Sequence, residues 1–188
     1  MGESSRQLEL NDAEVAIKTD PCWLLGYHTK AIILAELGRK PEAMAAAAVF
    51  KHLSLGRDVS EVTEYCRELQ VHVVESSDQL WRVFENVKQL EGKNQVVLLK
   101  EGEYLLERRV DISEEIVIVG HGKVSVACKT GAPFHFTAAC HVENVEMTEK
   151  YGRQEESQDH STNDNEPEVI RLAMPSGHEN TSNECKVN

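Results

Sequence analysis

The hydrophobic pattern of this chain changes its period near residue 70. Up to that point alanine, leucine and glutamate predominate, and the apolar residues recur every three or four positions, as on one face of a helix. From residue 71 to 148, valine and isoleucine predominate, and glycines separate short apolar runs. The pattern therefore predicts an α+β chain, with a helical half at residues 1–70 and a strand-rich half at residues 71–148.

The clearest helical signals lie in the first third of the chain. Asp20 and Pro21 open a helix that Gly38 closes, and Pro41 fits the first turn of the next helix, where its missing N–H costs little. The first helix has one apolar face, formed by Trp23, Leu24, Tyr27, Ala31, Leu34 and Leu37. The second helix, over residues 42–53, has alanines on one side, which predicts the close approach of a partner helix.

The spacing of these residues resembles a tetratricopeptide repeat (TPR), a helix–turn–helix unit of about 34 residues. With Gly38 at the turn of the unit, the positions that match are Ala16, Pro21, Tyr27, Ala31, Leu34 and Ala43. Ala47 and Phe50 depart from it, because small and large residues are exchanged there. The resemblance implies one complete repeat, preceded by a helix at residues 5–18 and followed by a capping helix at residues 60–69. About three repeats make a stable solenoid, so this half is expected to belong to a longer array or to be stabilised by the strands.

In TPR proteins the first helix of a repeat lines a groove that binds a partner. The resemblance carries this role to Leu25, His28, Ile32 and Glu36. These residues form a mixed face, without the lysines and asparagines with which chaperone-binding repeats hold a C-terminal carboxylate. Peptide binding through this face and a scaffold helix without a ligand therefore both remain open.

Short strands are predicted throughout the second half of the chain. They are expected at residues 71–74, 96–99, 110–112, 116–119, 123–127, 133–136 and 141–147. Leu80, Trp81, Phe84 and Val87 describe an amphipathic helix after the first strand. Turn signals separate the strands, among them the run Gly120-His121-Gly122.

This order of elements resembles the start of a right-handed parallel β-helix, the fold of pectate-lyase-like proteins and of some eukaryotic adaptors. The segments that carry the resemblance are the amphipathic helix, VVLL, EGEY, IVIVGHG and HVENVEM. In such folds a helix caps the first coil, and valine and isoleucine stack inside the coils. The resemblance covers residues 71–148, which is less than a stable β-helix normally has. Enzymes of this fold carry acidic calcium ligands on later coils, and the sequence shows no such cluster.

Acidic residues outnumber basic residues by 32 to 20, which gives a net charge of −12. Phosphate groups repel such a chain, so nucleic acids and membranes are not expected as partners. No apolar run reaches the ~18 residues that span a membrane. Residues 149–188 are polar and acidic, and they are predicted to be a disordered tail. Within this tail, the apolar segment 169–174 is either a docking strip or a chance cluster.

No pattern of residues typical of catalysis is present in the sequence. The five cysteines form no CxxC pair and the histidines are scattered, so neither a metal site nor a disulfide framework is predicted. The run from Gly120 to Lys123 lacks the spacing of a phosphate-binding loop. We therefore expect no catalytic residue, no cofactor and no metal. The cysteine pattern and a polar N-terminus predict a cytoplasmic location.

Three functional hypotheses follow from these patterns. The preferred one is a non-enzymatic adaptor that binds a protein partner through a TPR-like groove and a β-helix surface. Self-association through an exposed strand edge is expected in addition. The alternatives are a carbohydrate-binding or carbohydrate-processing β-helix protein, and a fragment or short isoform of a larger adaptor.

Overall fold

The computed structural model describes residues 3–54, 69–87 and 94–149. The described elements, in chain order, are α1 (Glu3–Thr19), α2 (Leu24–Glu36), α3 (Lys40–Leu53), β1 (Gln70–Val74), α5 (Ser77–Val87), β2 (Gln95–Leu106), β3 (Val110–Ile112), β4 (Ile116–Cys128), β5 (Phe134–Phe136), β6 (Cys140–Glu143) and β7 (Glu146–Glu149). The predicted α+β class is confirmed. Most of the helix predicted at residues 60–69 and the predicted tail after Glu149 lie outside the described residues.

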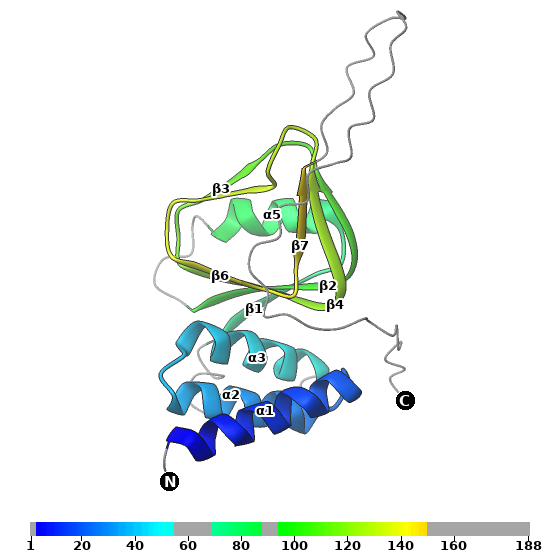
Figure 1. The fold of residues 1–188 in the computed structure, drawn as a ribbon. Coiled ribbons are helices and arrows are strands. Elements are labelled where there is room, and N and C mark those ends of the chain that lie inside the picture. Colours follow the sequence, from blue (N-terminus) through cyan, green and yellow to red (C-terminus); the bar gives the residue numbers. More distant parts are fainter. Residues whose placement is uncertain (1–2, 55–68, 88–93, 150–188) are drawn as a thin grey trace, which may run out of the picture.

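The first three helices form a stack on one side of the strands (Figure 1). α1 packs on α2, α2 packs on α3, and α3 contacts β2, β4 and β6. The turn between α2 and α3 depends on Gly38, whose φ of 73° lies in the left-handed region that favours glycine. Pro41 lies in the first turn of α3, as predicted.

The strands pair in parallel, one layer on the next, and are called the strand stack below. One sheet has the order β1-β2-β4-β6, with β7 paired to the second part of β4, and β3 and β5 form a second, two-stranded sheet. Equivalent positions of the first sheet are Gln95, Ile116 and Cys140, which stand side by side in register. In Figure 1 the strands outline three sides of a space, and α5 lies across it.

The two long strands bend part-way along their length. The pairing of β2 with β4 shifts register between Lys100 and Gly102. The turn predicted at residues 120–122 is instead a bend within β4, which continues to Cys128 and in which Gly122 has a φ of 89°. The hydroxyl of Tyr104 lies 2.9 Å from the carbonyl oxygen of Val74 and 2.8 Å from that of Lys100, so it ties the bend in β2 to the end of β1.

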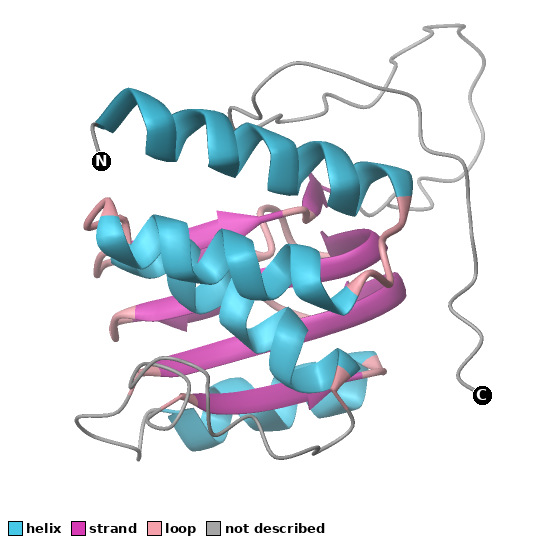
Figure 2. Cartoon of the chain, turned by 90° about the horizontal axis from the view of Figure 1, so that it is seen from below, coloured by secondary structure: helices cyan, strands magenta, loops and turns pink. Residues whose placement is uncertain are grey.

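Both faces of the central strands are buried over the first five residues of β2 and of β4. On β2, Val97 and Leu99 join an inner hydrophobic cluster with α5, whereas Val96 and Leu98 join an outer cluster with α3. Residues 43–50 of α3 are all buried, because small alanines let this helix approach both α2 and the strands. The helices lie over one face of the strands (Figure 2). Burial on two faces explains why residues 96–99 and 116–119 form continuous apolar runs, whereas the later parts of β2 and β4 also contain exposed positions.

The strand predicted at residues 141–147 is divided into β6 and β7. The division lies at Asn144, which adopts a left-handed φ of 56°. Beside it, Gly120 of β4 approaches so closely that a Cβ atom there would overlap the carbonyl oxygen of Asn144.

Within the described residues, no helix is long and apolar enough to cross a membrane.

Candidate functional site

The four residues predicted to bind a partner lie along one side of α2. Their steps of three and four positions place them on one helical face, and the buried residues of α2 are others, namely Gly26, Ala31, Ile33 and Leu34. Leu25 is 59% exposed and Glu36 is exposed, whereas His28 and Ile32 are half-buried. The structure therefore places Leu25 and Glu36 at the surface and leaves His28 and Ile32 partly covered.

Two of these residues are held by neighbouring helices. The carboxylate of Glu36 pairs with the guanidinium of Arg6 on α1 at 2.7 Å. The ring of His28 lies 5.1 Å from the ring of Phe50 on α3, measured between centroids. These contacts fix the two ends of the polar part of the face, and they leave Leu25 as its most exposed apolar side chain.

A second group of polar residues connects the helices to the strands. Lys30 of α2 pairs with Glu143 of β6 at 2.9 Å and with Glu14 of α1 at 3.5 Å. His141, two residues before Glu143, has its Nε2 atom 3.3 Å from the other carboxylate oxygen. The side chains of Lys30 and Glu143 are only 16% and 23% exposed, so little water screens this pair.

The pairing shifts the titration of both partners. Burial raises the pKa of Glu143, but the hydrogen bonds and charges of His141 and Lys30 outweigh it and bring the pKa down to about 2. Burial lowers the pKa of Lys30, and the carboxylates of Glu143 and Glu14 reverse that effect, so this pKa is raised overall. Both groups are therefore charged at neutral pH, and the pair joins α2 to β6 electrostatically.

Aromatic and imidazole rings meet at the bend of β4. The Nε2 atom of His121 lies 3.3 Å from the carbonyl oxygen of Pro21, and its ring lies edge-on to those of Tyr27 and His52. Burial, followed by the charges of Glu143 and Asp20, raises the pKa of Tyr27 to about 12. Burial, followed by the charges of His121 and Lys100, lowers the pKa of His52. Tyr27 and His52 are therefore neutral at pH 7, and they act as packing groups between helices and strands.

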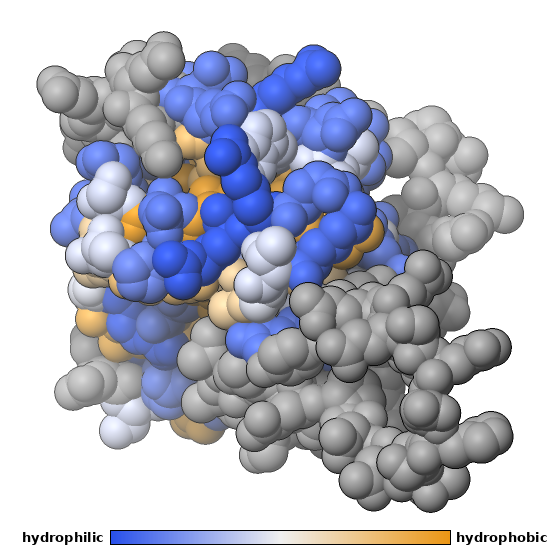
Figure 3. All heavy atoms as spheres, turned by 90° about the horizontal axis from the view of Figure 1, so that it is seen from above, coloured by the Kyte–Doolittle hydropathy of each residue, from blue (hydrophilic) through white to orange (hydrophobic). Residues whose placement is uncertain are grey.

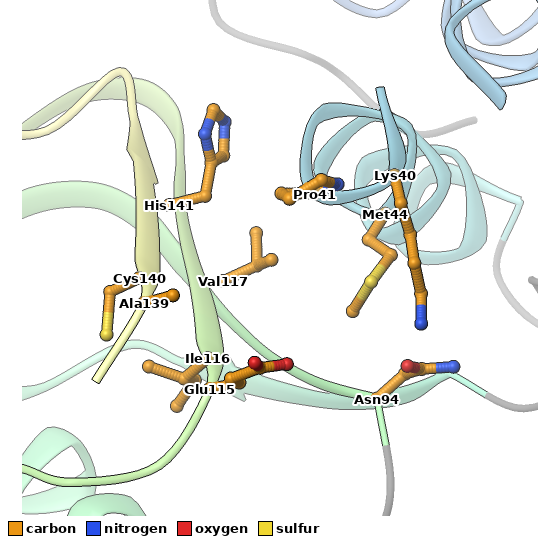
Figure 4. Close-up of a pocket in the computed structure, with 10 residues that line it drawn as sticks. All are labelled: Lys40, Pro41, Met44, Asn94, Glu115, Ile116, Val117, Ala139, Cys140 and His141. Atoms are coloured by element: carbon orange, nitrogen blue, oxygen red, sulfur yellow. The ribbon is translucent and has the colours of Figure 1, made fainter. Parts of the chain in front are cut away.

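A cavity of about 330 Å³ opens where the start of α3 meets the strands (Figure 4). Its lining consists of Lys40, Pro41, Met44, Asn94, Glu115, Ile116, Val117, Ala139, Cys140 and His141. Lys40 and Glu115 bring opposite charges to it, and the side chain of Met44 points toward the strands. Its volume lies in the range of small-molecule sites. No group of three His, Cys, Asp or Glu residues in the described ranges is placed to hold a metal ion.

The described cysteines differ in state. Cys128 is buried and Cys140 half-buried, and both carry free thiols. Burial, only partly offset by a backbone hydrogen bond, raises the pKa of Cys140, so its thiol is protonated at neutral pH and weakly nucleophilic. Cys22 is disulfide-bonded, which the cysteine spacing did not predict.

The junction between helices and strands was not predicted from the sequence. Lys30 was one usable signal, since it is a lysine close to the apolar face of a predicted helix, where a charged group needs a partner. Its partner could not be named, because Glu143 follows 113 residues later. On the side of the strands away from the helices, hydrophilic residues cover most of the described surface (Figure 3).

Comparisons with known proteins give no relative. No protein-family model matches the sequence, and neither a curated protein nor a solved structure matches it.

Proposed function

We propose that the chain is a non-enzymatic protein-interaction adaptor. In this proposal, α1, α2 and α3 are TPR-like hairpins, and the strands are the first coils of a short right-handed β-helix. The proposal is supported by the order of the helices around the Gly38 turn and by the parallel, in-register pairing at residues 95, 116 and 140. Such a molecule acts by presenting surfaces to other proteins.

The observation that carries the proposal is the exposed face of α2. Leu25 is a large apolar side chain that is 59% exposed, and His28 and Ile32 lie one and two turns further along the same side. Arg6 and Phe50 hold the flanking polar side chains in place. A helix face that combines an exposed apolar anchor with fixed polar groups is suited to bind a polypeptide, because fewer side chains lose freedom when the partner binds.

The proposal is tested by a charge on this face. Leu25→Glu is expected to reduce the recovery of a specifically captured partner by about tenfold, since loss of an apolar anchor typically costs more than 1 kcal/mol of binding energy. The measurement is quantitative mass spectrometry after affinity capture from cells with the full chain as bait. The matched control is Leu8→Glu on α1, where the wild-type side chain is 65% exposed.

Both substitutions are at exposed positions, so neither is expected to change the thermal unfolding midpoint appreciably. Partners that are recovered equally with wild type, Leu25→Glu and Leu8→Glu would show that the α2 face binds none of them. That result contradicts the proposed site.

A further inference from the structure

The two ends of the strand stack differ in how they are closed. At the first end, α5 places Leu80 and Phe84 against the inner cluster, where both are buried. At the other end, Val142, Val145 and Met147 pack against the same cluster but are only partly buried. The inner core is thus covered by a helix at one end, and the last strands expose part of it at the other.

Among the described strands, the last two also have one hydrogen-bonding edge without a partner strand. β6 and β7 each pair with β4, and no other described strand pairs with either of them. An unpaired strand edge is a template for strand addition, because its backbone N–H and C=O groups are already aligned. The partly exposed core and the free edge occur on the same strands.

The register determines which residues an added strand meets. Val142 stands beside Ile118, and Met147 stands beside Val126, so both continue ladders that belong to the inner cluster. The next strand in the stack would therefore cover Val142 and Met147 with apolar side chains at alternate positions. Its remaining side chains would point away from the core.

The charge of this end selects the chemistry of the occupant. Glu146 of β7 is exposed, Glu149 ends the same strand, and Glu14 and Glu115 lie close to β6. Two lysines lie next to β6 among the described residues: Lys30 is already engaged by two carboxylates, and Lys40 lines the same cavity as Glu115. A second copy of this chain would bring another acidic edge and a net charge of −12, which opposes self-pairing.

We propose that the free edge of β6 and β7 binds an extended segment of a protein partner in which apolar residues alternate with lysine or arginine. The apolar residues of this segment cover Val142 and Met147, and its basic residues face the acidic side chains. The partner strand extends the parallel stack by one layer. This surface shares no residue with the face of α2 formed by Leu25, His28, Ile32 and Glu36, so substitutions can test the two sites separately.

The test uses synthetic peptides and the full chain. A fluorescent peptide that alternates valine and lysine is titrated with the protein, and its anisotropy is recorded. A second peptide has glutamate in place of lysine. We expect the lysine peptide to bind at least about tenfold more tightly than the glutamate peptide. Its affinity should fall as salt is added. Equal binding of both peptides, or binding of neither, overturns the proposal.

A pair of charge reversals locates the binding site. Glu146→Lys at the free edge is expected to lower the affinity for the lysine peptide by about fivefold to tenfold. Glu85→Lys on α5 is the matched control, since Glu85 is also exposed. It is expected to leave peptide binding unchanged, because α5 lies at the opposite end of the strands. Leu25→Glu should also leave peptide binding unchanged, which distinguishes this surface from the α2 face. Equal effects of Glu146→Lys and Glu85→Lys contradict the assignment.

The alkylation rate of the Cys140 thiol on β6 shows directly whether the peptide covers this edge. It is free and half-buried, and it stands beside Ile116. Bound lysine peptide is expected to slow its alkylation several-fold, as measured by mass spectrometry of the fragment that contains Cys140. Unchanged alkylation at saturating peptide contradicts binding at β6.

Two other occupants give different results. If the free edge belongs to the chain's own apolar segment at residues 169–174, Ile170→Asp in the full chain raises the affinity for the peptide. If it belongs to a second copy, the wild type is a dimer by light scattering, and Glu146→Lys changes the dimer fraction. Either result overturns the proposal of a basic partner segment. A monomer whose peptide affinity is unaffected by Ile170→Asp agrees with it.

Discussion

Replacement of Gly120 by alanine is expected to lower the free energy of unfolding by about 2 to 3 kcal/mol. The new Cβ atom would overlap the carbonyl oxygen of Asn144 and lie 3.1 Å from the Cβ atom of Val124. Neither neighbour can move away easily, because one is backbone and the other belongs to the buried core. The chain between β6 and β7 has to shift, so the substitution disturbs the last two strands directly.

The measurement is urea unfolding of the wild type and Gly120→Ala. Gly131→Ala is the control, because Gly131 also has an unusual backbone, with a φ of 126°, but a Cβ there meets no atom within 4 Å. We expect the control to cost only the conformational strain of about 1 to 2 kcal/mol. A Gly120→Ala variant as stable as the wild type would show that β4 and the Asn144 turn do not approach each other as described.

Replacement of Lys30 by methionine is expected to lower the free energy of unfolding by about 2 to 3 kcal/mol at neutral pH. The substitution leaves Glu143 as a mostly buried carboxylate with only His141 as a partner. Removal of both charges in Lys30→Met/Glu143→Leu should restore stability to within about 1 kcal/mol of the wild type, because no unpaired charge is then buried. The double-mutant cycle measures the coupling directly.

The difference between the wild type and Lys30→Met depends on pH in a defined direction. The pKa of Glu143 is about 2 in the folded chain, against an ordinary value of 4.5. A carboxyl group with a lowered folded pKa stabilises the fold above its unfolded pKa, and this contribution is lost as the pH falls through the folded pKa. The difference should therefore be complete above about pH 5 and decrease steadily toward pH 2.

At the alkaline end, the sign is reversed for Lys30. Its folded pKa is raised above 10.5, so its contribution is complete below that value and lost as the pH rises beyond the folded pKa. Urea unfolding at a series of pH values measures both limits. A difference between the wild type and Lys30→Met that is constant from pH 7 to pH 2 would contradict the pairing with Glu143.

The local elements could be predicted from the sequence because their signals are local. The spacing from Tyr27 to Leu34 and the Gly38–Pro41 turn predicted where α2 and α3 lie in the sequence. Apolar runs such as residues 96–99 predicted where the strands lie. The turn expected at residues 120–122 was wrong for a physical reason. Glycine permits a bend as well as a turn, and the pairing with β2 on both sides of the bend keeps β4 a single strand.

The packing between the two halves could not be predicted, because it depends on contacts between distant residues. The alanines of α3 predicted the close approach of a helix, and the structure adds Val96 and Leu98 of the strands to that contact. The helical half therefore packs against the strands through α3. The ion pair of Lys30 with Glu143 has the same origin, since nothing near either residue in the sequence indicates the other.

The helices and the strands form a single unit through the contact of α3 with β2 and β4, and this is the central claim to test. The two tryptophans allow a direct test, because Trp23 precedes α2 and Trp81 lies on α5. In Trp81→Phe, fluorescence follows the helices, and in Trp23→Phe it follows the strand stack. We predict that the two variants give coincident urea unfolding curves once each is scaled to its own stability by circular dichroism. In either variant, a fluorescence midpoint at a clearly different urea concentration from the midpoint by circular dichroism would contradict the claim.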